Sequence, residues 1–284
     1  MYENLPNLDF KAFFNMSSTP FTQNIPVEAL YQSEQFLDSM GRLLYAAKNK
    51  QFAVLTAAPG CGKSTLLRAL SAELDEDKYT ILYVSDSNLS ARWLYAIPLT
   101  KMGYEAKFHT KDARIQLQDM LYKEMEVKGK NVVIIVDEAH LVDHHNNRST
   151  LQEIRFMLNC EFDSGNPLSL ILSGQNELWD LIAHKDHKAI IQRIDQICKI
   201  PALDNWQVAQ YIETHLKYAG TDDTIISSAA IEMISNASAG VPRVINKICT
   251  HSLIYAAKCR QSVINEDLVR AVIERELPPN MCLG

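Results

Sequence analysis

A phosphate-binding loop is indicated by the stretch AAPGCGKST, which runs from Ala57 to Thr65 between an apolar run and a helix-like segment. It fits the pattern G-x-x-x-x-G-K-[ST] except at the first position, where Ala57 replaces glycine. In such a loop, backbone N–H groups and a helix N-terminus surround phosphates, a lysine neutralises their charge, and a hydroxyl ligates Mg²⁺. The residues expected to contact a nucleotide are Ala58, Pro59, Gly60, Cys61, Gly62, Lys63, Ser64 and Thr65.

Two adjacent carboxylates end the buried-strand pattern NVVIIVDEAH at residues 131–140. Asp137 is expected beside the phosphate loop, because open parallel sheets bind ligands at the carboxyl ends of their strands. There it would hold Mg²⁺, directly or through water, together with Ser64. Glu138 would orient and deprotonate the water that attacks the γ-phosphate. Two adjacent acids could also lie in a solvated turn, but their occurrence together with GKST favours a role in ATP hydrolysis. We interpret His140 as a loop histidine rather than a sensor.

Composition and charge describe a globular chain without an export or membrane signal. Its 284 residues are 47% hydrophobic, which suffices for one large domain or for a large and a small one. The formal net charge of −6 gives no overall basic field that would attract nucleic acid. Six cysteines without a C-x-x-C pair indicate reduced thiols and therefore a cytoplasmic protein. No apolar run reaches the roughly 18 residues of a membrane span.

Strands and helices alternate along the first two thirds of the chain. Short apolar runs at residues 52–57, 80–85, 131–137, 168–173 and 196–200 predict five parallel strands with helices on both faces of the sheet. After about Pro201 the pattern becomes purely helical. Four helices are predicted within residues 204–220, 223–240, 241–260 and 265–276. The expected fold class is therefore α/β, with a parallel five-stranded P-loop sheet followed by a small all-α domain.

The order of the motifs resembles a known family. AAPGCGKST, VIIVDEAH, LILSGQNEL, IQRID and AGVPRVINKIC are similar to motifs of AAA+ ATPases of the initiator-like branch. Within that branch the chain resembles ExeA-type secretion ATPases and transposition helper ATPases similar to phage Mu B protein. The resemblance implies four parts: an N-terminal segment 1–36, a P-loop AAA+ domain 37–201, a helical lid 202–276 and a tail 277–284. The segment PFTQNIPVEALYQSEQF resembles the family's adenine-pocket segment, which implies that Phe21 contacts the nucleotide.

The resemblance also implies roles for residues outside the two main motifs. A polar sensor near the γ-phosphate is either Ser173 or Gln175. Arg193 resembles the arginine that reaches a neighbouring subunit's nucleotide, although it also fits an ordinary surface arginine. Arg243 matches the second sensor on the lid, which contacts the nucleotide of its own subunit.

The whole-protein function expected from this resemblance is transposition. ExeA-type relatives generally append a transmembrane helix and a wall-binding domain, for which the residues after Glu276 are too few. We therefore expect an oligomer, as a filament or ring, that binds duplex DNA with little sequence preference and recruits or activates a transposase. One alternative is a cytoplasmic ATPase of a secretion or envelope-assembly system. Another is a nucleotide-gated interaction switch with little turnover.

DNA contacts are expected in the locally basic segment 85–114. Its cations could bind phosphates without reading the base sequence, and a solvated helix face is the alternative. The aromatic residues Trp93, Tyr95 and Tyr104 fit packing better than base stacking. The predicted contacts are Arg92, Lys101 and Lys107, with Lys111 and Arg114 nearby.

Overall fold

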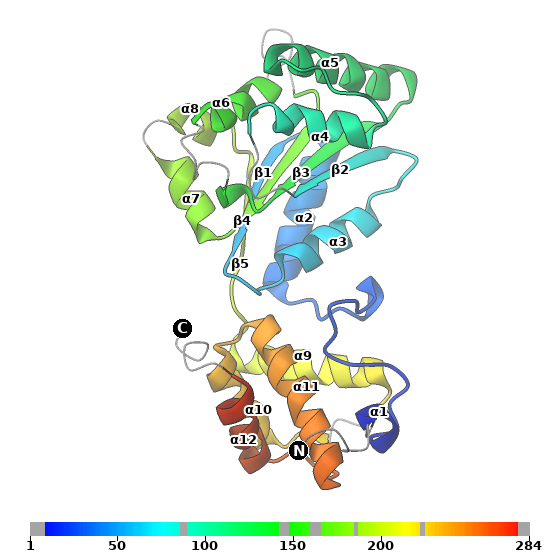
Figure 1. The fold of residues 1–284 in the computed structure, drawn as a ribbon, viewed down its shortest axis with the longest axis vertical. Helices are drawn as coiled ribbons and strands as arrows, with labels where there is room; N and C mark the ends of the chain where they lie inside the picture. The colour runs from blue at the N-terminus through cyan, green and yellow to red at the C-terminus, as the bar shows by residue number, and fades with distance from the viewer. Residues whose placement is uncertain are drawn as a thin grey trace. The chain divides into compact units, whose positions relative to one another are not determined.

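The chain forms two compact units in the structure, a computed structural model that describes residues 9–85, 90–141, 148–158, 166–184, 187–221 and 225–277. The sheet unit comprises Glu34–Pro59 and Lys63–Ile200. The helical unit comprises the chain up to Ser33, the short stretch Gly60–Gly62, and the chain from Pro201 onward. Figure 1 shows the strands in the first unit and the helices α9 to α12 in the second.

The sheet unit is built on five parallel strands in the order β2-β3-β4-β1-β5. All six residues of β1 and of β4 are buried, as their continuous apolar runs require of strands covered on both faces. The prediction of a five-stranded parallel sheet is confirmed, with strand ends within one residue of those expected. The strands are β1 (Phe52–Ala57), β2 (Tyr79–Ser85), β3 (Asn131–Asp137), β4 (Ser169–Gly174) and β5 (Gln196–Ile200).

Helices cover both faces of this sheet. Alternate residues of β1 and β3, such as Phe52 and Ile134, pack with side chains from α4 to α7 in one core, while α2 contacts four of the strands. Successive side chains of a strand point to opposite faces of the sheet, which explains how the same strands pack against helices on both faces. The helices are α2 (Glu34–Lys48), α3 (Lys63–Glu73), α4 (Trp93–Lys101), α5 (Thr110–Tyr122), α6 (Arg148–Met157), α7 (Asn176–Ala183) and α8 (Lys188–Ile191), with a π-helical turn at Lys123–Val127 and a 3-10 turn at Ala139–Leu141.

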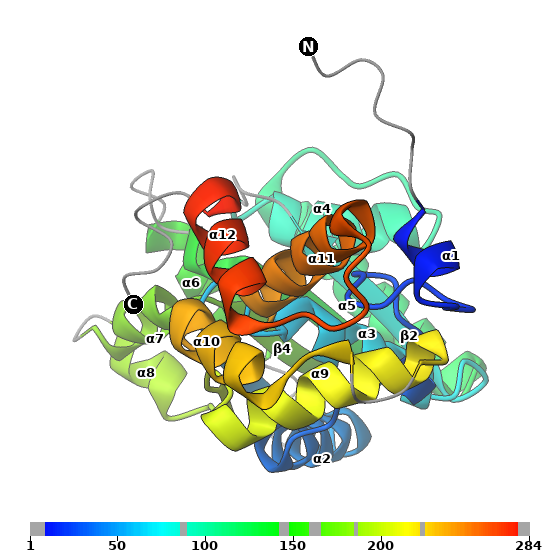
Figure 2. The same ribbon diagram turned by 90° about the horizontal axis from the view of Figure 1, so that it is seen from below.

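The helical unit contains the four predicted C-terminal helices (Figure 2). Asp204 and Gln207 form a reciprocal capping box at the start of the first one, which ends at left-handed Gly220. A Cβ on Gly240 would lie 1.8 Å from the carbonyl oxygen of Leu203, so this position admits only glycine. The helices are α9 (Asn205–Ala219), α10 (Ser228–Ser238), α11 (Pro242–Cys259) and α12 (Glu266–Glu276).

The N-terminal segment belongs to the helical unit. It carries α1 (Phe10–Phe13) and a 3-10 turn at Val27–Ala29. Phe14, Met16 and Phe21 are buried in one core with side chains of α9 and α11. The Phe21 ring stacks on His215 with 5.1 Å between centroids, and the Phe21 N–H donates to His215 Nδ1 at 3.0 Å. The ring and the backbone of Phe21 are thus both held by α9.

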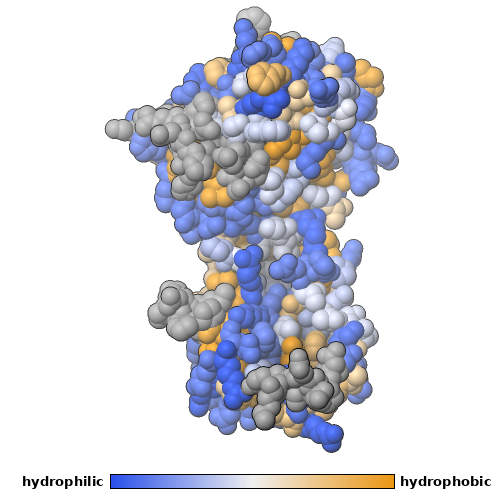
Figure 3. Space-filling view, in the orientation of Figure 1, coloured by the Kyte–Doolittle hydropathy of each residue, from blue (hydrophilic) through white to orange (hydrophobic). Residues whose placement is uncertain are grey.

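None of the helices in the described ranges is long and apolar enough to cross a membrane. On the face drawn in Figure 3, hydrophilic residues are interspersed with small hydrophobic patches over both units. Such scattered apolar residues are ordinary for a protein surface in water.

Candidate functional site

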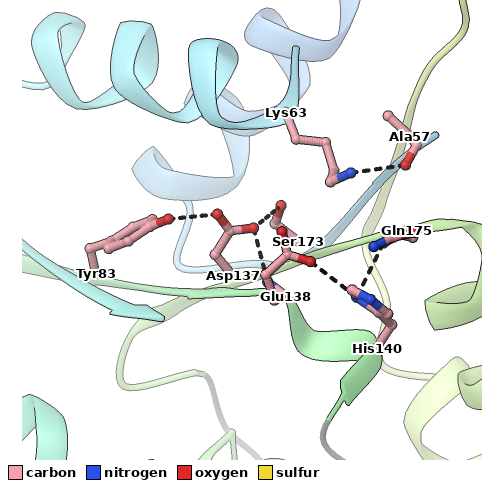
Figure 4. A network of polar contacts seen from close by, with 8 residues as sticks. All are labelled: Ala57, Lys63, Tyr83, Asp137, Glu138, His140, Ser173 and Gln175. Carbon is pink, nitrogen blue, oxygen red and sulfur yellow. Dashed lines mark hydrogen bonds and ion pairs between the residues drawn. The ribbon is translucent and has the colours of Figure 1, made fainter. Parts of the chain in front are cut away.

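The carboxyl ends of three neighbouring strands, β3, β4 and β1, bring most of the predicted site residues of the sheet unit together, with the exception of Arg193 (Figure 4). Asp137 ends β3, and Glu138 follows it. Ser173 is the second-last residue of β4, and Gln175 follows that strand. Lys63 begins α3, directly after the loop that leaves β1. Parallel pairing places these ends at one edge of the sheet, which is where such sheets bind ligands.

The phosphate loop has the backbone geometry that its glycines permit. Gly60 and Gly62 have φ angles of 82° and 97°, in the left-handed region that disfavours other residues. The Lys63 ammonium is buried and donates to the backbone carbonyl of Ala57 at 2.9 Å. Because the lysine uses the backbone of Ala57, this contact does not require glycine at the first position of the pattern. Ser64 is exposed on the first turn of α3.

The tip of the loop, Gly60–Gly62, groups with the helical unit. Within that unit, the Arg243 N–H donates to the carbonyl oxygen of Gly60 at 3.3 Å from the first turn of α11. A Cβ on Gly60 would lie 2.8 Å from the Cβ of Arg243. Close backbone approach, as well as a positive φ, therefore selects glycine at this position.

Asp137 is a buried carboxylate that accepts three hydrogen bonds. Its Oδ1 accepts from the Ser173 hydroxyl at 2.8 Å and from the Glu138 N–H at 2.9 Å. Its Oδ2 accepts from the Tyr83 hydroxyl at 2.5 Å. Burial and this hydrogen bond to Asp137 raise the pKa of Tyr83 above its usual range, so the phenol stays protonated and donates. An ionised carboxylate has about four acceptor sites, so one remains for a metal or a water.

Glu138 has a strained backbone and a partly exposed side chain. Its φ of 54° is unusual for a residue with a side chain, and such strain clusters at functional sites. Its Oε2 lies 3.4 Å from His140 Nδ1. The Gln175 N–H lies 3.4 Å from the same nitrogen. Since one nitrogen cannot both accept and donate a proton, His140 bonds either to Gln175 when Nδ1 is unprotonated or to Glu138 when it is protonated.

Tyr83 and His140 are site residues that the sequence did not assign. His140 was interpreted as a loop histidine, yet it is buried between the ends of β3 and β4. Tyr83 lies on β2, in register with Ile135 of β3. The sequence gives little sign that Tyr83 belongs to the site. A helical segment separates β2 from β3 along the chain, so no local pattern indicates that the two strands are neighbours.

Arg193 lies at the amino ends of the strands, whereas the cluster around Asp137 lies at their carboxyl ends. It precedes β5, whose five residues run roughly 17 Å toward the carboxyl edge. Ser173, Asp137 and Lys63 are at that far edge. Arg193 is thus too distant to contact phosphates held by the loop of its own sheet unit.

The predicted DNA contacts lie around α4. The Arg92 guanidinium lies 5.2 Å from the Trp93 ring centroid and 5.8 Å from that of Phe108, and its Nε donates to the Phe108 carbonyl at 2.7 Å. Lys101 and Lys107 are exposed. The packing interpretation fits Tyr95, which is buried, but not Trp93 and Tyr104, which are exposed.

The donors at the carboxyl edge fit a magnesium nucleotide. Ser64 and Asp137 offer hard oxygen ligands, which Mg²⁺ prefers. The described residues contain no group of three or more His, Cys, Asp or Glu side chains placed to hold a metal. Mg²⁺ does not need such a cage, because it is commonly bound by one or two protein oxygens together with waters and substrate phosphates.

Comparison with known proteins agrees with this geometry. Residues 46–182 match the model of a family described as "AAA domain". The chain is 29% identical over 273 residues to General secretion pathway protein A of Aeromonas hydrophila, in an alignment that covers 93% of this chain and 48% of that protein. The chain therefore spans about half the length of this curated relative.

Several solved structures have the same fold. The Aeropyrum pernix ORC2 protein has a TM-score of 0.61 at 16% identity, covering 93% of this chain and 71% of that one. The Thermotoga maritima RuvB Holliday junction branch migration motor has a TM-score of 0.58 at 19% identity, covering 89% and 72%. Drosophila ORC bound to DNA has a TM-score of 0.62 at 13% identity, covering 96% and 68%. The expected AAA+ fold, a parallel sheet followed by helices, is confirmed.

Proposed function

We propose that this chain binds ATP with Mg²⁺ and hydrolyses it to ADP and phosphate. The observation that carries the proposal is the convergence of Lys63, Asp137 and Glu138 at the carboxyl edge of one sheet. The match of residues 46–182 to an AAA domain supports the same chemistry.

Each residue has a separate task in this reaction. Lys63 exchanges the Ala57 carbonyl for phosphate oxygens and neutralises their charge. Glu138 orients the attacking water and accepts its proton. Ser173 and Tyr83 hold the Asp137 carboxylate in one orientation. Mg²⁺, bound by Ser64 and Asp137, would supply positive charge to the phosphate oxygens.

Arginines would complete the site at a distance from this cluster. We propose that Arg243 senses the nucleotide of its own chain, since its backbone already contacts the loop tip at Gly60. Arg193 would act on the nucleotide of a second copy, because its position at the amino edge excludes its own loop. Phe21 would contact the adenine side, although its ring is 5% exposed and stacked on His215. Such a contact therefore requires the ring to move.

Two variants separate binding from hydrolysis. Lys63→Ala should weaken ATP binding, because it removes the charge that faces the phosphates. Glu138→Gln should bind ATP normally and hydrolyse it at least about a hundredfold more slowly, because the amide cannot accept the proton. Isothermal titration with ATP and a phosphate-release assay measure the two effects. Lys48→Ala, an exposed lysine at the end of α2, serves as the control. Equal loss of ATP binding in Lys63→Ala and Glu138→Gln would contradict this division of roles.

The cellular role proposed for the ATPase is in a general secretion pathway. This proposal is supported by the 29% identity to General secretion pathway protein A, which extends over 93% of this chain. The short stretch after Glu276 no longer argues against it, since this chain spans about half of that relative.

Target-DNA selection for a transposase is the second candidate. The exposed Lys101 and Lys107, with Arg92 at the start of α4, favour it, because surface cations bind DNA phosphates. In either role we propose that ATP assembles the chains into a filament or ring in the cytoplasm. Binding of duplex DNA distinguishes the two candidates.

A further inference from the structure

A groove of about 670 Å³ lies at the amino edge of the sheet, away from the carboxyl edge that carries Asp137. It is bounded by the turn that precedes β1, the last turn of α6, and the segment from α8 to β5. In Figure 1, α6 and α8 lie beside each other at this end of the sheet unit, and they are in contact. All of the lining residues belong to the sheet unit.

Among the residues that the structure describes, three cations and one carboxylate line this groove. The cations are Lys50, Arg155 and Arg193, and the carboxylate is Asp195. Asp195 Oδ2 accepts the backbone N–H of Phe52 at 2.9 Å, so this carboxylate is partly engaged by the start of β1. The described lining residues therefore carry an excess of two positive charges, within a chain whose net charge is −6.

Lys50 and Arg155 form no ion pair with the residues that the structure describes. Lys50 has a left-handed φ of 52°, and its ammonium lies 2.7 Å from the sulfur of Met125, a weak acceptor that carries no charge. Arg155 is exposed. The side-chain amide of Gln192 adds hydrogen-bond donors, whereas the Asn49 amide already donates to the Tyr45 carbonyl oxygen at 2.8 Å.

We propose that this groove is a second anion site, which binds the phosphate groups of a polyphosphate. Guanidinium groups bind phosphate oxygens in pairs, and an ammonium adds a compact charge. Lys50 and Arg155 are the assigned ligands, with Arg193 completing the set. The site is distinct from the phosphate loop, because roughly 17 Å of strand separates the two edges.

The phosphates have two possible sources. One is a free polyphosphate in solution. The other is the nucleotide held in the phosphate loop of a second copy of this chain. The second source rests on the proposed ATPase function, whereas the first does not.

Binding of pyrophosphate to Lys63→Ala protein tests the first source. This background removes the loop lysine, so the part of the binding that titration calorimetry at low salt finds to depend on Lys50 or Arg155 reports the groove. Pyrophosphate should bind with one-to-one stoichiometry, and adding Lys50→Gln or Arg155→Gln should weaken binding about tenfold or more. The control is Lys48→Gln, which removes an exposed lysine two residues from Lys50 and should leave binding unchanged.

Complementation of hydrolysis tests the second source. Arg155→Gln protein retains its phosphate loop but lacks a groove arginine, and Lys63→Ala protein retains the groove but lacks the loop lysine. Each should be inactive alone, and the mixture should recover hydrolysis if the groove of one copy meets the nucleotide of another. Lys48→Gln mixed with Lys63→Ala should show no gain beyond its own activity.

The two experiments distinguish the two sources. Pyrophosphate binding lost in Lys50→Gln and Arg155→Gln identifies a free anion as ligand, and complementation identifies a second copy's nucleotide. If neither occurs, while thermal melts show folded variants and the wild-type chain hydrolyses ATP, the anion site is refuted and the ATPase proposal stands. Equal behaviour of the groove variants and the Lys48→Gln control refutes the site as well.

Discussion

At the residue scale, the orientation of Asp137 depends on donors from two other strands. Tyr83 of β2 bonds one carboxylate oxygen, and Ser173 of β4 bonds the other. Two fixed oxygens leave the carboxylate little freedom to rotate. In the proposed reaction this matters because a metal ligand must already point at its ion to bind it tightly.

We therefore expect Tyr83→Phe to change the magnesium requirement. The variant keeps the ring and removes one hydroxyl, whose bond to a charged partner is worth about 1 kcal/mol at this partly exposed position. Half-maximal hydrolysis should need roughly three- to tenfold more Mg²⁺, while ATP binding measured without Mg²⁺ should not change.

A magnesium titration of the hydrolysis rate measures this shift. Tyr45→Phe, an exposed tyrosine on α2, is the matched control. A lower maximal rate with an unchanged magnesium midpoint would mean that Tyr83 supports the fold and does not position Asp137.

At the element scale, the N-terminal segment and α9 are joined by a histidine that must remain neutral. His215 Nδ1 accepts the Phe21 N–H, so this nitrogen carries no proton in the folded chain. Burial lowers the pKa of His215 from 6.5 to about 4. The folded state therefore binds this proton less readily than the unfolded state does.

Stability should consequently fall as the solution becomes acidic. The contribution of His215 is fully present above about pH 6.5 and is lost progressively as pH falls toward about 4. Between pH 7.5 and 5 the wild-type helical unit should lose about 2 kcal/mol more than His215→Asn, whose amide oxygen can still accept from Phe21.

Urea denaturation followed by circular dichroism at several pH values measures this difference. Comparing the two chains removes the effect of other titrating groups. Parallel pH profiles for wild type and His215→Asn would show that His215 does not titrate in this range.

At the scale of the whole molecule, the sheet separates two sets of charged residues. The carboxyl edge carries the proposed nucleotide site, and the amino edge carries the cationic groove with Arg193. In the proposed oligomer, one edge of a copy would meet the other edge of the next, as in a head-to-tail assembly. Many weak contacts to DNA would then add up along such an assembly.

Duplex DNA provides the test of the transposition candidate. If it holds, binding should require ATP or a slowly hydrolysed analogue, and affinity should fall steeply from about 50 to 200 mM salt as counterions are released. Lys101→Glu with Lys107→Glu should abolish DNA binding and leave ATP binding intact, because both residues lie outside the nucleotide motifs.

Fluorescence anisotropy with a labelled duplex measures the affinity. The control is the double reversal Lys123→Glu with Lys188→Glu, which changes the net charge equally at exposed positions outside segment 85–114. If ATP-loaded protein ignores DNA at low salt, the transposition candidate fails and the secretion role is favoured.

The sequence by itself determined the elements and their chemistry. Continuous apolar runs predicted the five strands to within one residue, because strands buried on both faces need apolar side chains throughout. GKST and the DE pair are each a contiguous motif, so local spacing was enough to place Lys63 at the start of a helix and Asp137 and Glu138 at the end of a strand. Gly220 was predicted as a helix end because its left-handed conformation is a local requirement.

Only the tertiary structure decided which of these elements are neighbours. Tyr83 meets Asp137 across the pair β2 and β3, and His140 meets Gln175 where β3 and β4 end, although helical segments separate these strands along the chain. No local pattern could show these pairings. In the strand order β2-β3-β4-β1-β5, β1 lies between β4 and β5, away from its place along the chain. The same order puts Arg193 beside Lys50 and Arg155 in one groove. Spacing along a chain reports the period of an element, whereas contacts between distant elements depend on how the whole core packs.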